Sequence, residues 1–244
     1  MSSHQFLTRR RVLLAGVATL LATPALGESI SGHLPWLPDR SDPPKPVVAG
    51  PWRFFTPEEG SAVEALVDRI IPPDPKTVGG KDAGCAVFID RQLAGGYGRS
   101  DGLYMLPPFQ DGEPTQADQT PLTPAQSYRQ ALAALDGYCR SGFVGNAFRQ
   151  LGVDQQDLVL TKLEKGEAKL DGADGRKFMA LLIKDTRAGF FADPVYGGNV
   201  NMAGWRMIGF PGARYDYRDW IGRHNETYPL PPVGLLGRPG WNEG

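Results

Sequence analysis

The stretch TPEEGSAVEALVDRIIPP, residues 56–73, contains both the start and the stop signal of a helix. Thr56 is a favoured N-cap residue, Pro57 suits the first helical turn, and Glu59 completes a capping box. Pro72 and Pro73 then end the helix. The apolar residues between these signals recur at intervals of three and four, the spacing of one helical face; they are Ala62, Val63, Leu66, Val67, Ile70 and Ile71.

The same start signal recurs further along the chain, at Thr123, Pro124 and Gln126, where apolar residues again follow at helical spacing. Further helices are expected over 84–94, 143–151, 154–163 and 177–186, with Asp154 as the cap of the third of these. No segment alternates with the period of a strand, and no hairpin signal occurs. The sequence therefore predicts an all-α protein: a small helical bundle with long irregular loops and extended N- and C-terminal arms.

Glycine and proline mark where the helical part begins and ends. The chain has 31 glycines and 22 prolines in 244 residues, above the usual roughly 7% and 5%. Six of the prolines lie in residues 28–53, which are expected to form an extended arm because proline blocks helix and central strand alike. The helical domain is placed at 54–217, and a C-terminal extended tail at 218–244.

Residues 1–27 have the pattern of an export signal. A basic segment that includes Arg9 and Arg10 precedes a short apolar run, and small residues up to Gly27 offer a cleavage site. The arginine pair resembles the twin-arginine signal, which exports folded proteins. We therefore expect a twin-arginine signal peptide, cleaved near Gly27, and a periplasmic location. A general secretory signal and an uncleaved anchor are the alternatives.

Cys85 and Cys139 are the two cysteines of the chain, and both follow the predicted signal. Two cysteines in an exported protein are a reasonable disulfide pair, which would join two of the predicted helices. Two separate buried thiols are the alternative. The disulfide is the favoured prediction.

Residue types that carry catalysis or hold cofactors are scarce. Beyond the predicted signal the histidines are His33 and His224, and the sequence has no haem-attachment motif, zinc-ligand pattern or dinucleotide fingerprint. No basic stripe suggests nucleic-acid binding, and the formal net charge is −1. No catalytic, cofactor-binding or metal residue is assigned to this chain.

Two carboxylates, Asp193 and Asp216, lie near aromatic residues and could form the acid pair of a hydrolase. The simpler roles are an Asx-turn at Asp193, which precedes Pro194, and an ion pair of Asp216 with Arg214 or Arg218. These structural roles are the favoured interpretation.

Residues 189–217 are rich in glycine and aromatic residues. Glycines permit tight turns, whereas aromatic and arginine side chains are enriched where proteins bind one another. Some of the rings are expected to fill the fold and others to contact a partner. The candidate partner-interface residues are Phe190, Phe191, Tyr196, Trp205, Arg206, Phe210, Arg214 and Tyr215.

The segments GFFADPVYGGN (189–199) and GWRMIGFPG (204–212) closely resemble the small, or gamma, subunit family of gluconate 2-dehydrogenase. Related small subunits accompany FAD-dependent fructose, sorbitol and glucose dehydrogenases. The helix that begins at Thr56 and the twin-arginine pattern also resemble this family. The resemblance covers most of residues 54–217.

The resemblance implies a non-catalytic subunit that binds, stabilises and escorts a partner. The partner would be a large flavoprotein of the glucose-methanol-choline type, which holds FAD and oxidises a sugar, a polyol or gluconate. A multi-haem cytochrome c is a possible third subunit, and membrane association would occur only through the complex. The cofactor residues of the family belong to the other subunits, so none is assigned here.

Two other functions fit the residues. An independent periplasmic carbohydrate-binding protein could stack sugars on the aromatic rings, and a stand-alone hydrolase could use the two aspartates. The identity of the oxidised sugar is not encoded in this chain, because specificity would lie in the large subunit.

Overall fold

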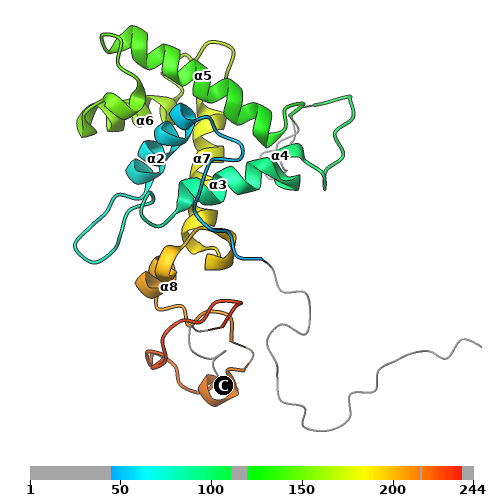
Figure 1. Cartoon of the computed structure of the whole chain (residues 1–244), viewed down its shortest axis with the longest axis vertical. Coiled ribbons are helices and arrows are strands. Elements are labelled where there is room, and N and C mark those ends of the chain that lie inside the picture. Colours follow the sequence, from blue (N-terminus) through cyan, green and yellow to red (C-terminus); the bar gives the residue numbers. More distant parts are fainter. Residues whose placement is uncertain (1–44, 111–119, 215, 238–244) are drawn as a thin grey trace, which may run out of the picture. The chain divides into compact units, whose positions relative to one another are not determined.

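The computed structural model describes residues 45–110, 120–214 and 216–237, and these residues confirm the all-α prediction. Within them the structure has helices and isolated β-bridges but no sheet. The α-helices, drawn in Figure 1, are α2 (Pro57–Ile70), α3 (Cys85–Ala94), α4 (Gly96–Arg99), α5 (Pro124–Gly142), α6 (Val153–Lys165), α7 (Gly175–Phe191) and α8 (Ala203–Ile208). The 3₁₀ turns are η1 (Phe148–Gln150), η2 (Pro194–Tyr196), η3 (Val200–Met202) and η4 (Arg218–Trp220).

The two predicted capping boxes are both present. The hydroxyl oxygen of Thr56 accepts a hydrogen bond from the backbone N–H of Glu59. The backbone N–H of Thr56 in turn donates to the side-chain carboxylate of Glu59. Thr123 and Gln126 do the same at the start of α5. Because each box satisfies two backbone donors of the first turn, the starts of these helices could be located from the sequence.

Two of the sequence-based helix assignments need correction. The expected helix over 143–151 is only the three-residue turn η1, because Val144 and Gly145 have positive φ angles of 53° and 82° that interrupt a helix. Asp154 lies inside the first turn of α6, whose N-cap is Gly152. The carboxylate there faces the positive end of the helix dipole and does not cap it.

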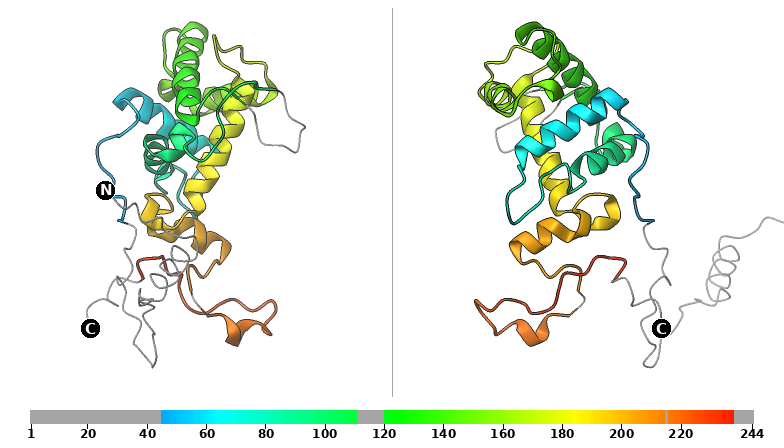
Figure 2. Two further views of the ribbon diagram at one scale, coloured as in Figure 1. Left: turned by 90° about the vertical axis from the view of Figure 1, so that its right-hand side faces the viewer. Right: turned by 60° about the vertical axis from the view of Figure 1, so that its left-hand side comes forward.

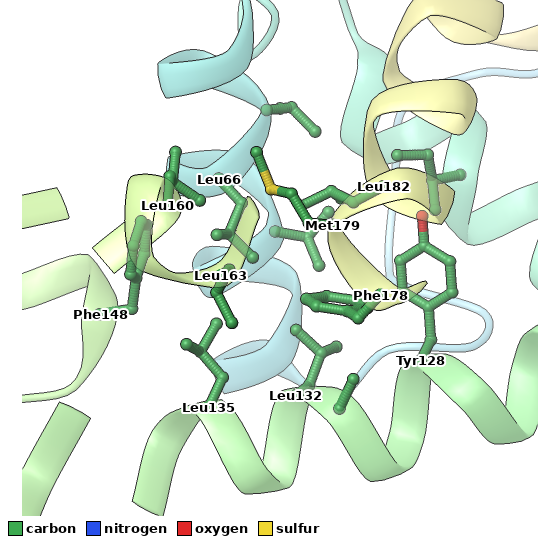
Figure 3. Packing of buried hydrophobic residues seen from close by; sticks show 14 of the residues in the cluster. Leu66, Tyr128, Leu132, Leu135, Phe148, Leu160, Leu163, Phe178, Met179 and Leu182 are labelled. Carbon is green, nitrogen blue, oxygen red and sulfur yellow. The ribbon is translucent and has the colours of Figure 1, made fainter. Parts of the chain in front are cut away.

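Helix α7 contacts α2, α3, α5 and α6, and the apolar core forms around it. Figure 3 shows Phe178, Met179 and Leu182 of α7 surrounded by leucines of the neighbouring helices. The labelled leucines are Leu66 of α2, Leu132 and Leu135 of α5, and Leu160 and Leu163 of α6. The spacing of these residues along each helix is the apolar periodicity visible in the sequence.

The end of the predicted proline-rich arm is part of the folded body. Asp90 of α3 is fully buried, and its carboxylate accepts the backbone N–H groups of Arg53, Phe54 and Phe55 at 2.9 Å. The guanidinium of Arg91 also pairs with Asp90. A carboxylate on α3 therefore fixes the chain just before α2, across the boundary that composition placed between residues 53 and 54.

The predicted disulfide is absent: Cys85 and Cys139 are free thiols, and both are fully buried in the core. Burial raises the pKa of Cys85 to about 12 and that of Cys139 to about 11. A thiol must ionise before it can attack another sulfur, so this environment keeps both side chains protonated and unreactive. The alternative interpretation of two separate buried thiols is the correct one.

Candidate interaction surface

The glycine- and aromatic-rich stretch folds back on the end of α7. Helix α7 ends at Phe191, five residues beyond the predicted end, so the stretch begins inside a helix. A Cβ at Gly198 would lie 2.2 Å from the carbonyl oxygen of Gly189, and one at Gly204 would lie 2.2 Å from that of Phe190. Only glycine permits these backbone approaches. We call residues 189–212 the cap; Figure 2 shows α8, which belongs to it, beside the C-terminal end of α7.

Buried hydrogen bonds hold the cap in one conformation. The side chain of Asn199 is fully buried; its amide nitrogen donates to Ala192 and its oxygen accepts from the N–H of Gly204, both at 2.8 Å. The indole N–H of Trp205 donates to the carbonyl oxygen of Phe191 at 2.8 Å. A polar group that is buried with all its partners favours a unique arrangement, so the cap is a preformed surface.

The predicted interface residues separate into two groups. Phe190 and Trp205 are 0% and 6% exposed, so they belong to the interior and not to an interface. Phe191, Tyr196 and Phe210 are exposed, as is Arg206, and Arg214 is half-buried. Tyr215 lies outside the described residues. The buried rings support the exposed ones, since Phe190 contacts Phe191 edge-on and Trp205 contacts Phe210 in the same way.

Three exposed apolar residues of the cap were not predicted: Val200, Met207 and Ile208. Met207 and Ile208 lie at the end of α8, which has six residues and is too short to show a helical period in the sequence. We define the cap surface by its exposed large apolar side chains, which are Phe191, Tyr196, Val200, Met207, Ile208 and Phe210. These side chains are the candidates for contact with a partner, because exposed apolar patches mark sites of protein–protein contact.

The two candidate hydrolase carboxylates have structural roles. Asp193 accepts the N–H of Val195 at 3.0 Å, the predicted Asx-turn, and its second oxygen accepts the N–H of Leu235 at 2.7 Å. Asp216 pairs with Arg218, and the hydrogen bonds from Arg218 lower the pKa of Asp216 to about 2. A general acid of a glycosidase needs a raised pKa, so Asp216 is not suited to that role.

One buried polar cluster was not predicted from the sequence. Asp185 of α7 accepts hydrogen bonds from the hydroxyl groups of Tyr97 and Tyr128 at 2.8 and 2.9 Å. Burial raises the pKa of Asp185, and burial together with this carboxylate raises the pKa of both tyrosines. The sequence gives no sign of this cluster, because Asp185 is 57 residues from Tyr128 and 88 residues from Tyr97.

The Asp185 cluster ties α4 and α5 to α7, because one carboxylate oxygen binds the hydroxyl of Tyr97 on α4 and the other binds that of Tyr128 on α5. A cavity of about 630 Å³ lies beside it, lined by residues that include Tyr97, Phe178, Leu181 and Lys184. Tyr97 of the cluster forms part of the wall of that cavity. The cluster's most direct role is to hold three helices together.

The described residues contain no candidate for two other kinds of site. No group of three or more histidine, cysteine or acidic side chains in these ranges could hold a metal ion. Among the described helices, none combines the length and the apolar character that a membrane crossing requires.

A family model described as gluconate 2-dehydrogenase subunit 3 matches residues 57–212. The match begins at the first residue of α2 and ends at the last residue of the cap. It covers more than half of the chain and includes every core helix, and Phe55 of the core lies just before it. Neither the curated proteins nor the solved structures that were searched contain a match to the chain.

Proposed function

Because the chain belongs to the gluconate 2-dehydrogenase subunit 3 family, we propose that it is the non-catalytic small subunit of an FAD-dependent sugar, polyol or gluconate dehydrogenase. Family membership implies a dehydrogenase complex as its setting. The partner is a large flavoprotein of the glucose-methanol-choline type, which holds FAD and carries out the oxidation. A multi-haem cytochrome c is a possible third subunit.

The cap carries this proposal. It lies within the family match, its backbone is fixed by glycine contacts and by Asn199, and its apolar side chains remain exposed. A surface that is ordered before binding loses little conformational entropy when a partner covers it. Exposed aromatic, methionine and isoleucine side chains supply the apolar contact, and Arg206 can add polar contact at the same place.

The proposal also covers the export of the flavoprotein together with this chain. Arg9 and Arg10, outside the described residues, are assigned to a twin-arginine signal, and the chain escorts the folded flavoprotein to the periplasm. The escort has a physical rationale. A large subunit that folds around its cofactor in the cytoplasm can share the signal of a bound partner, because this route transports folded proteins.

The test is co-purification with the large subunit. The affinity-tagged flavoprotein from the same host is co-expressed with the chain, and the amount of chain recovered per bound flavin is measured. We expect a stable complex. The double variant Met207→Asp/Ile208→Asp should lower recovery at least tenfold, about 1.4 kcal/mol, because it would place two carboxylates in a buried interface.

Val144→Asp is the matched control, since Val144 is 98% exposed on the segment between α5 and α6, remote in sequence from the cap, and should leave recovery unchanged. A wild-type chain that never co-purifies with the flavoprotein would contradict the proposal. If that lone chain also binds sugars in calorimetry, the carbohydrate-binding alternative is the better one.

A further inference from the structure

The chain continues beyond the family match as a loop that closes on itself. The backbone N–H of Ala213 donates to the carbonyl oxygen of Val233 at 2.7 Å, and a β-bridge joins Gly212 to Val233. Inside the loop, the guanidinium of Arg214 donates to Pro231 at 2.7 Å. We call residues 212–233 the C-terminal loop. The part of the predicted extended tail that the structure describes is therefore folded back to the end of the cap.

The C-terminal loop is joined to the cap by the carboxylate of Asp193. One oxygen of Asp193 holds the turn that presents Tyr196, and the other accepts the N–H of Leu235, just after the loop. Gly212 is shared by both segments, and the hydroxyl of Tyr217 donates to its carbonyl oxygen at 2.8 Å. The loop is thus tied to the cap by the side chain of Asp193 and by the shared residue Gly212.

The side chains of the loop are of the types that dominate protein interfaces. The rings of Tyr217 and Trp220 both contact Tyr228, with centroids 5.9 and 5.0 Å apart. Arg214 lies over the Tyr228 ring and Arg223 over the Trp220 ring, at 5.0 and 4.6 Å from the centroids. Aromatic rings interleaved with arginines form a cluster that offers both apolar area and hydrogen-bond donors.

The three rings of this cluster are half-buried, whereas two apolar side chains of the same loop are exposed. Ile221 is 72% exposed, and Leu230 is also exposed. Of the loop's large apolar side chains in the described residues, Val233 is the buried one. The Nε of Arg214 is buried but has no hydrogen-bond partner. The loop therefore has three aromatic rings among its described residues, exposed apolar side chains and little core of its own, features typical of a surface that contacts a partner.

We propose that the C-terminal loop binds the same flavoprotein subunit as the cap surface, with Ile221 and the Trp220–Tyr228 pair as its main contacts. This inference rests on the proposed function. We assign the loop and the cap to one partner, because Asp193 and Gly212 hold these two neighbouring segments in one arrangement. The loop lies outside the family-matched residues, so it adds binding surface to what family membership accounts for.

Dissociation kinetics test this proposal. Tagged flavoprotein large subunit is immobilised, and the dissociation rate constant is measured for full-length chain variants. Ile221→Asp should raise the rate constant at least tenfold, and Trp220→Ala/Tyr228→Ala should do the same. Ile221→Asp is the cleaner variant, because that side chain is exposed and its change leaves the fold intact. Val144→Asp again serves as the control and should not change the rate constant.

The outcomes separate this inference from the proposed function. If Met207→Asp/Ile208→Asp speeds dissociation while Ile221→Asp and Trp220→Ala/Tyr228→Ala stay within twofold of wild type, the cap binds the flavoprotein and the loop does not. That result overturns the inference alone. If the wild-type chain does not bind the flavoprotein at all, both proposals fail.

Discussion

The two cysteines show how burial decides the chemistry of a side chain. The number of cysteines and the predicted export favoured a disulfide, yet Cys85 and Cys139 are each enclosed by the apolar core as free thiols. The raised pKa of each thiol removes the reactive thiolate at neutral pH. Composition alone gives no information on the burial of these two thiols.

Thiol titration with an aromatic disulfide reagent checks this result. In native buffer near pH 8 neither cysteine should react within minutes, because both are protonated and inaccessible. In denaturant two thiols per chain should react without prior reduction. A denatured, unreduced chain that shows no reactive thiol would mean that the cysteines are bonded.

Asp90 provides a second test at one side chain. Asp90→Ala would remove the buried acceptor of three backbone N–H groups and of the Arg91 guanidinium. The free energy of unfolding, measured in urea, should therefore fall by about 3–5 kcal/mol. Asp90→Asn keeps one acceptor oxygen and should lose less stability. Asp101→Ala, which removes an exposed ion pair with Arg99, is the control and should change little. Equal effects of Asp90→Ala and Asp101→Ala would contradict the role of Asp90.

Among the helices, α7 determines where the cap lies. Its first half contributes Phe178 and Leu182 to the core, and its last turn provides the backbone against which Gly198 and Gly204 pack. Capping signals located α2 and α5 correctly, because capping is a local interaction between neighbouring residues. The end of α7 and the whole of α8 were missed, because contacts between distant segments determine both.

A pair of glycine substitutions tests the contact between α7 and α8. Gly204→Ala should lower the melting temperature by several degrees, because the added methyl group would meet the carbonyl oxygen of Phe190. Gly137→Ala on α5 adds the same methyl group where nothing lies within 4 Å, so it should keep or raise the melting temperature. Equal melting temperatures for the two variants would show that α7 and α8 are not in close contact.

For the complete chain, the proposed escort role joins an export signal to a partner-binding body. The signal and the body are separate in sequence, so a variant can remove one and keep the other. This separation allows export to be tested without disturbing the cap or the core.

Arg9→Lys/Arg10→Lys should retain the flavoprotein in the cytoplasm when the two chains are co-expressed, because the twin-arginine route requires the arginine pair. Dehydrogenase activity in periplasmic and cytoplasmic fractions measures this. The amount of assembled complex in whole cells should not change. Undiminished periplasmic flavoprotein would show that the large subunit does not depend on this chain for export.

Sequence pattern alone accounts for the helical class, for the two capped helices and for the family resemblance of the cap. These features depend on neighbours within a few residues: a cap and its partner, an apolar repeat, or a short run of glycines and rings. The Asx-turn of Asp193 and the ion pair of Asp216 with Arg218 were predictable for the same reason.

Tertiary contacts determined which rings are buried and which are exposed. Phe190 and Phe191 are adjacent in sequence, yet one is fully buried and the other faces solvent, because α7 turns its successive side chains toward different neighbours. The Asp185 cluster, the Asp90 contacts and the link from Asp193 to Leu235 likewise join residues 35 to 88 positions apart. Local pattern carries no information on such pairs, because they become neighbours only when the whole chain folds.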